Sequence, residues 1–177
     1  MARTLTSATG TFNRNGFTLI ELVVVLVILA MVTLLVWPRL PDTRAAALKS
    51  SARNMATTIR YLEDQVIATR QPFRLRLSPG TGDVSVTLPQ ADGTENAPSD
   101  PLLSRHPLAD GVTIADVQLP RLGTVSTGEV ALDFSPAGLT DTVTLHLREA
   151  GGGQMTIIAF SYGGRVVVRD GYQEAQL

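Results

Sequence analysis

The 177-residue chain contains no cysteine. Disulfide frameworks, cysteine-ligated zinc, iron–sulfur clusters and thiol catalysis are therefore all excluded. The chain also lacks an excess of positive charge, because 15 Lys and Arg residues stand against 16 Asp and Glu residues, for a net charge of −1. A protein that coats nucleic acid needs such an excess to neutralise phosphates, so the balanced charge disfavours this class of protein. It does not exclude a local basic patch.

The motifs of common enzyme sites are missing as well. No Gly-x-Ser-x-Gly nucleophile elbow occurs, and Gly151-Gly152-Gly153 lacks the Lys-Ser/Thr pair and the following helix of a phosphate loop. The chain has two histidines, His106 and His146, which we interpret as a loop residue and a surface residue rather than as metal ligands or members of a triad. We therefore expect no catalytic residue, no metal site and no cofactor.

The chain does contain one long apolar run. Of the 21 residues from Phe17 to Trp37, 18 are apolar, and the exceptions are Thr18, Glu21 and Thr33. About 20 such residues, at a rise of about 1.5 Å each, cross the hydrocarbon core of a bilayer. We predict a transmembrane helix over residues 17–38.

The preceding residues 1–16 are polar, carry Arg3 and Arg14, and contain no acidic side chain. This is typical of a targeting leader whose positive end stays in the cytoplasm. An ordinary secretory signal has a shorter apolar stretch, followed directly by a small-residue cleavage site. The long run therefore favours a leader of another kind.

The leader joins the apolar run at Gly16-Phe17-Thr18-Leu19-Ile20-Glu21. The Gly, the Phe, the Glu five residues after the Gly and the apolar run together resemble the processing motif of type IV pilins and type II secretion pseudopilins. The resemblance implies that prepilin peptidase cuts between Gly16 and Phe17 and methylates Phe17. Residues 1–16 would then be a cleaved leader.

Glu21 needs a physical explanation, because a carboxylate in a membrane helix costs about 2.5–3.5 kcal/mol on insertion scales. Cleavage after Gly16 creates an ammonium group on Phe17. The resemblance implies that Glu21 pairs with this group of a neighbouring subunit and so sets the axial register of assembly. Pairing within one helix at i+4, and a simple position at headgroup depth, remain alternatives.

Pro38 and Pro41 close the apolar run. Inside a helix each removes a backbone hydrogen bond and clashes with the preceding turn. The sequence leaves two outcomes open: a bent continuous helix, or the end of the membrane helix.

An amphipathic helix is predicted over residues 39–71. Apolar residues recur at spacings of 4, 3, 4, 3 and 4 and draw one stripe along it, formed by Leu48, Ala52, Met55, Ile59, Leu62 and Val66. The stripe is short and rich in small residues, which favours packing on a sheet over a coiled coil. Pro72 ends the helix.

After Pro72 the hydrophobic period becomes 2, which predicts a β-sheet domain over residues 72–177. We expect a hairpin over 73–88, a long loop over 89–107 that contains four prolines, a tight turn at Gly163-Gly164, and further strands at about 112–119, 129–134, 142–148, 155–162 and 165–169. No βαβ pattern occurs. The predicted fold class is α+β: a long N-terminal helix, membrane-spanning in its first half and amphipathic in its second, packed on an antiparallel sheet.

This order of elements, with Phe134-Ser135-Pro136-Ala137-Gly138 and Gly164-Arg165-Val166 near its end, is similar to the minor pseudopilin H class (GspH), which is grouped with FimT-type minor pilins. The resemblance implies the pseudopilin fold and a non-enzymatic subunit near the tip of a type II secretion pseudopilus. It also implies a single-pass protein of the bacterial inner membrane with its C-terminal domain in the periplasm. The implied partners are prepilin peptidase, other major and minor pseudopilins, inner-membrane lipid and the platform of the secretion machinery.

Two alternatives remain. A FimT-like minor pilin involved in pilus assembly or DNA uptake would use Arg165 and Arg169, which lie four apart on one face of a predicted strand. Loss of Arg3 and Arg14 with the leader changes the net charge from −1 to −3, which disfavours nucleic acid as a partner. The other alternative is an anchored periplasmic domain that joins no fibre.

Overall fold

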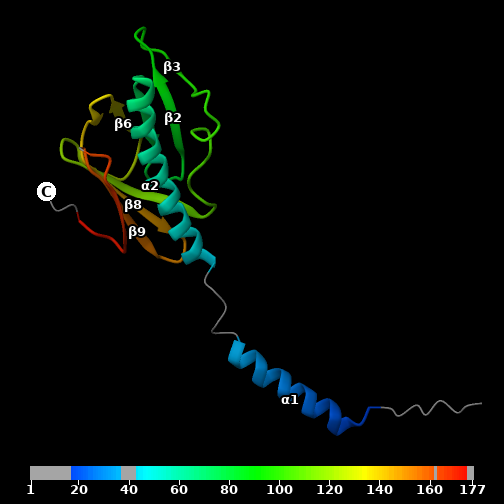
Figure 1. Cartoon of the computed structure of the whole chain (residues 1–177). Helices are drawn as coiled ribbons and strands as arrows, with labels where there is room; N and C mark the ends of the chain where they lie inside the picture. Colours follow the sequence, from blue (N-terminus) through cyan, green and yellow to red (C-terminus); the bar gives the residue numbers. More distant parts are fainter. Residues whose placement is uncertain (1–16, 37–42, 162, 175–177) are drawn as a thin grey trace, which may run out of the picture. The chain divides into compact units, whose positions relative to one another are not determined.

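The computed structural model describes residues 17–36, 43–161 and 163–174. The chain divides into two units, Met1–Pro41 and Asp42–Leu177, and each is described by itself. In the first unit, helix α1 spans Leu19–Val36 (Figure 1). The predicted leader, Gly16, and the predicted bend or break at Pro38 and Pro41 lie outside the described residues.

The second unit begins with helix α2, Thr43–Thr69. All six residues of the predicted apolar stripe are buried, which confirms that this face packs inward. The helix ends where Arg70 takes a left-handed conformation, with φ 56°, and its N–H donates to the Val66 carbonyl at 2.9 Å. This is a common helix stop, and Pro72 follows it closely.

Within the described residues, ten strands form two antiparallel five-stranded sheets. The first sheet has the order β3-β2-β1-β6-β7, with β1 Phe73–Leu77, β2 Val84–Pro89, β3 Glu95–Asn96, β6 Val130–Ser135 and β7 Gly138–Leu139. The second has the order β10-β9-β8-β4-β5, with β4 Val112–Leu119, β5 Gly123–Val125, β8 Val143–Glu149, β9 Gln154–Ala159 and β10 Val166–Asp170. The α+β class is confirmed.

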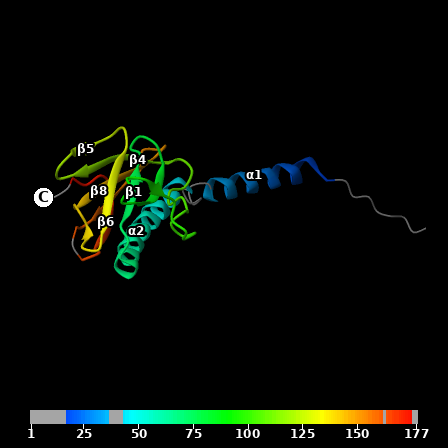
Figure 2. The same ribbon diagram turned by 90° about the horizontal axis from the view of Figure 1, so that it is seen from above.

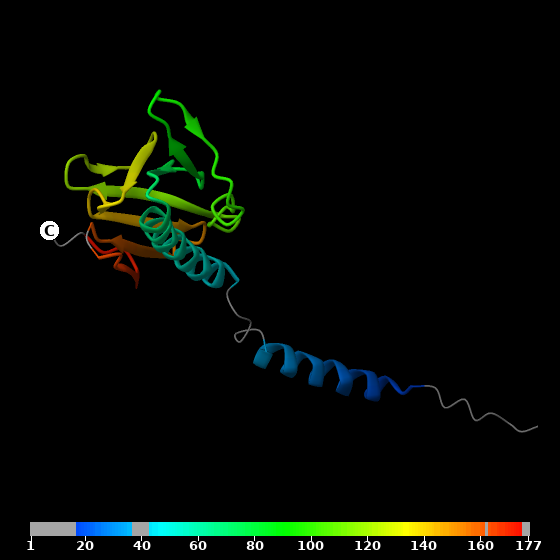
Figure 3. The same ribbon diagram turned by 45° about the horizontal axis from the view of Figure 1, so that its top comes forward.

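The hydrophobic core lies between α2 and the inner faces of both sheets. Helix α2 contacts β8, β9, β10 and β4 of the second sheet and β6 and β7 of the first (Figures 2 and 3). On β1, the side chains of Phe73, Leu75 and Leu77 are buried, and the intervening arginines point outward. The same alternation on β8 directs Val143, Leu145 and Leu147 into the core. The outer faces of the two sheets therefore carry the polar side chains.

The sequence predicts a tight turn at Gly163-Gly164, but the paired strands β9 and β10 end at Ala159 and begin at Val166, so the connection between them is longer than predicted. Gly163 and Gly164 have φ angles of 82° and 63°, a region that glycine enters without steric cost. The Phe160 N–H donates to the Arg165 carbonyl at 3.0 Å across the hairpin. The turn sets the register that places Arg165 directly before β10.

Candidate functional site

A helix cap holds the start of α1. The Glu21 N–H donates to Thr18 Oγ1 at 3.3 Å, which makes Thr18 the N-cap residue and Glu21 the third residue of the helix. Thr-x-x-Glu is the capping-box pattern, and a carboxylate in the first turn also interacts favourably with the helix dipole. The sequence interpretation missed this local role of Glu21, although the spacing of Thr18 and Glu21 carries the signal.

Phe17 precedes the cap and is 83% exposed. None of the ion pairs among residues 17–36, 43–161 and 163–174 involves Glu21. The carboxylate is thus available for a cation from another molecule. Cleavage between Gly16 and Phe17, methylation of Phe17 and pairing of Glu21 stay predictions.

The surface of α1 is apolar on every side. Its large apolar side chains from Leu19 to Leu34 are between 45% and 81% exposed. Such an all-round apolar helix is typical of a segment that other helices or lipid surround. Among the residues that the structure describes, no helix reaches the length and hydropathy needed to cross a membrane. The membrane span predicted over 17–38 therefore stays a prediction.

The region predicted as a loop over 89–107 begins with a second hairpin. Strand β2 runs to Pro89, and β3 returns along it with Leu88 opposite Asn96 and Pro89 opposite Glu95. The turn between them contains Asp92-Gly93, and Gly93 has a φ of 84°. Asp-Gly is a strong hairpin signal that the sequence interpretation passed over.

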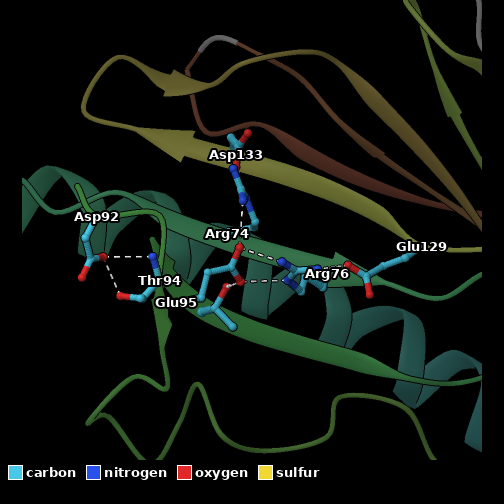
Figure 4. A network of polar contacts seen from close by, with 8 residues as sticks. Arg74, Arg76, Asp92, Thr94, Glu95, Glu129 and Asp133 are labelled. Atoms are coloured by element: carbon cyan, nitrogen blue, oxygen red, sulfur yellow. Dashed lines mark hydrogen bonds and ion pairs between the residues drawn. The ribbon is translucent and has the colours of Figure 1, made fainter. Parts of the chain in front are cut away.

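Glu95 anchors this hairpin to the outer face of the first sheet (Figure 4). Its Oε1 lies 2.8 Å from Arg74 Nη1 and 2.6 Å from Arg76 Nη2, and its Oε2 accepts a hydrogen bond from Thr87 at 2.8 Å. The hydrogen bonds from Arg76 and Thr87 lower the pKa of Glu95 to about 2. Glu95 therefore remains ionised well below neutral pH, and the hairpin stays fixed to β1.

The same two arginines extend the network across β1. Arg74 Nε lies 2.6 Å from Asp133 Oδ1 on β6, and Arg76 also pairs with Glu129. Each guanidinium thus meets two carboxylates, which leaves neither charge unpaired. Both guanidinium groups of this network are thus engaged by the three carboxylates around them.

The rest of the region over 89–107 is tied to α2. Tyr61 donates a hydrogen bond to Asp100, which lowers the pKa of that carboxyl, and Leu103 is buried in the core. A hollow of about 290 Å³ lies between α2 and this segment, lined by Tyr61, Thr57, Leu102 and neighbouring side chains. Leu102 is 52% exposed there. The contacts of Asp100 and Leu103 hold the segment against α2.

A larger groove, of about 830 Å³, lies on the outer face of the second sheet. Its lining residues lie on the five strands of this sheet or next to the ends of these strands, and residues 172–174 also line it. Arg165 and Arg169, the candidate nucleic-acid contacts, both line this groove. The Arg165 guanidinium carbon lies 4.5 Å from the centroid of the Phe160 ring, within cation–π distance.

The prediction that His146 is a surface residue is wrong. His146 lies on β8 with no solvent exposure, because residues 171–174 fold over the outer face of the sheet. Its Nδ1 is 2.7 Å from Asp116 Oδ1, its Nε2 is 2.9 Å from the Gln173 carbonyl oxygen, and the Tyr172 ring stacks on it at 3.7 Å. Because a backbone carbonyl occupies Nε2, the pair of His146 and Asp116 fixes the C-terminal segment rather than activating a nucleophile.

Further hydrogen bonds hold the same segment. Thr156 Oγ1 donates to the Gly171 carbonyl at 2.7 Å and accepts from the Gln173 N–H at 3.0 Å. Gln118 Nε2 donates to the Tyr172 hydroxyl at 3.0 Å. Burial raises the pKa of Tyr172, which therefore keeps its proton at neutral pH. Residues 171–173 form a fixed wall of the groove.

No cluster of three or more His, Asp or Glu side chains that could hold a metal ion occurs in the part of the chain that the structure describes. His106 lines a small hollow beside Arg76 and Glu129, far along the chain from His146.

Comparisons with known proteins agree with these features. Residues 11–37 match the family model described as the prokaryotic N-terminal methylation motif, and residues 51–168 match the model of the type II transport protein GspH. None of the curated protein sequences matches the chain.

Two solved structures match the chain. The minor pseudopilin EpsH from the type 2 secretion system of Vibrio cholerae is 20% identical, with a TM-score of 0.55, and the match covers 70% of this chain and 97% of that one. The type IV minor pilin FimU of Pseudomonas aeruginosa is 18% identical, with a TM-score of 0.49, over 73% of this chain and 92% of that one.

Proposed function

Because the chain belongs to the family of the type II transport protein GspH, we propose that it is a minor pseudopilin, a non-enzymatic subunit near the tip of the type II secretion pseudopilus. Prepilin peptidase removes residues 1–16 and methylates Phe17. The mature subunit is anchored in the bacterial inner membrane by the apolar helix, with the α2 and sheet unit in the periplasm. It then joins other major and minor pseudopilins, together with the secretion platform, to assist protein secretion.

One observation supports this proposal most directly. The N-terminal methylation motif covers the junction of leader and helix, and there Phe17 is exposed and Glu21 has no ion-pair partner among the described residues. When apolar helices associate, a carboxylate leaves water and needs a cation. The ammonium group that cleavage creates on Phe17 of a neighbouring subunit supplies that cation.

The capping box provides a second explanation for Glu21, and substitutions separate the two. Glu21→Gln removes the charge but keeps a side chain that suits the third position of a capping box. Thr18→Ala removes the cap, at a cost of about 1 kcal/mol to the helix start, but keeps the charge. Asp110→Asn removes an exposed acid from a loop of the second unit that does not line the groove, and serves as the control.

We expect Glu21→Gln to be processed and inserted normally but to be lost from the pseudopilus fraction and to impair secretion. Thr18→Ala and Asp110→Asn should assemble. The measurement is recovery of each variant with the major pseudopilin after crosslinking in cells. Assembly of Glu21→Gln at the wild-type level, with loss of Thr18→Ala, would show that Glu21 serves only the helix cap.

A FimT-like role in pilus assembly or DNA uptake remains the alternative. Its candidate contacts, Arg165 and Arg169, share one groove. The other side chains that line this groove favour a ligand of a different chemical class.

A further inference from the structure

The groove on the second sheet is long enough for an extended segment of polypeptide. Its lining comes from every strand of that sheet, from β10 at one edge to β5 at the other. Five strands about 4.8 Å apart make the groove roughly 19 Å wide across the strands, which leaves room for an extended chain that lies along β10 and advances roughly 3.3 Å per residue. The floor carries Thr124, Thr142 and Thr144, whose hydroxyl groups can donate to and accept from a peptide backbone.

Its charge is positive on balance, because Arg165 and Arg169 line it together with one acidic residue, Glu174. Arg165 and Arg169 are exposed, and neither makes an ion pair with any described residue. By contrast, Arg74 and Arg76 on the first sheet are each paired with two carboxylates. The geometry of the second sheet thus presents two guanidinium groups on one side of a groove, ready for anionic partners.

The aromatic side chains of the groove distinguish between anionic ligands. Single-stranded nucleic acids bind by stacking bases on free aromatic faces along a strongly basic track. Here the Tyr172 ring stacks on His146 with an interplanar angle of 15°, and Arg165 covers a face of Phe160. Two arginines are also few for a phosphate backbone. Carboxylates on a peptide fit this surface better than phosphates on a nucleic acid.

The wall of the groove is fixed before any ligand arrives. Thr156 hydrogen-bonds to Gly171 and Gln173, and Asp116 holds His146, on which the Tyr172 ring stacks. These contacts hold residues 171–173 in place. A preformed site loses less conformational freedom on binding than a mobile one.

We propose that this groove binds an extended, acidic segment of another protein, with two carboxylates paired to Arg165 and Arg169. Four residues along a strand separate these arginines by roughly 13 Å, so acidic residues about four positions apart in an extended ligand match them. The site does not involve Phe17 or Glu21. The proposed peptide binding can therefore be refuted while the proposed assembly role holds, and the assembly role can be refuted while the peptide binding holds.

The test uses the full-length protein in a neutral detergent and follows fluorescence anisotropy of labelled ten-residue peptides. One peptide carries Glu at positions 3 and 7 in a Ser/Thr background, a second carries Gln there, and a third carries Lys. A ten-nucleotide oligothymidine is the nucleic-acid probe. The variants are Arg165→Gln with Arg169→Gln and, as a matched control, Arg148→Gln, an exposed arginine of β8 that does not line the groove.

We expect the Glu peptide to bind more tightly than the Gln and Lys peptides, with an affinity that falls as salt rises. The double variant should bind it about tenfold more weakly, and Arg148→Gln should bind as the wild type does. Circular dichroism checks that the double variant is folded. Equal binding of the Glu and Gln peptides, or no loss in the folded double variant, would overturn the proposal. Tighter binding of oligothymidine that the double variant abolishes would assign the groove to nucleic acid instead.

Discussion

Leu62 tests the packing of α2 against the sheets. It has no solvent exposure, and it lies in the stripe that faces the strands. Replacing a fully buried Leu by Ala removes apolar contacts and leaves a cavity, which costs about 2–5 kcal/mol. A unit of about 140 residues has an unfolding entropy near 0.3 kcal/mol/K, so a loss of about 3 kcal/mol lowers Tm by roughly 10 °C.

The assay is thermal unfolding of the unit Asp42–Leu177, followed by circular dichroism. All the buried apolar residues of the described chain lie between Leu48 and Val166, so we expect this unit to fold alone. Ile67→Ala is the control on the same helix, because Ile67 is 66% exposed, and its Tm should change little. Equal, small Tm shifts for Leu62→Ala and Ile67→Ala would refute the packing described for α2.

Two acidic residues give further predictions with opposite pH dependence. The lowered pKa of Glu95 means that its ion pairs add stability above the usual Glu pKa of 4.5, and that this contribution fades as the pH falls towards 2. Glu95→Gln should therefore lower Tm at pH 7 and increase amide exchange in β3, and a Tm difference that does not shrink by pH 3 would contradict this assignment. Glu63 is buried with one unbonded oxygen, and burial raises its pKa, so the wild type loses stability as the pH rises through that pKa. Glu63→Gln should raise the free energy of unfolding in urea by about 1 kcal/mol over the wild type at pH 8 and leave it unchanged at pH 4. An equal increase at both pH values would count against this assignment.

The sequence predicts the elements that a single hydrophobic period dictates. The stripe from Leu48 to Val66 follows the helical repeat, and the alternation of Phe73, Leu75 and Leu77 follows the strand repeat, so burial on one face sets both. The five further strands predicted after the first hairpin also appear in the structure, within a few residues of their expected bounds. The positive φ angles of Gly163 and Gly164 are a local property of the Gly-Gly pair, whereas the length of the connection between β9 and β10 differs from the prediction.

The predictions that fail or fall short depend on contacts between distant parts of the chain. His146 lies on an outward face by strand period, and only the fold of residues 171–174 over the sheet buries it. The position of Glu95 against Arg74 joins residues 21 apart, through a hairpin whose local Asp-Gly signal was overlooked. Likewise, the division of the strands into two sheets follows from pairings such as β1 with β6, which no periodicity encodes.

The proposed assembly of the subunit depends on a charge at Phe17 that exists only after the leader has been removed. The most direct measurement is the intact mass of the protein extracted from the inner membrane of its cells. We expect a chain that begins at Phe17 and carries one added methyl group. A chain that still contains residues 1–16, or one that begins beyond the apolar helix, would contradict the assignment.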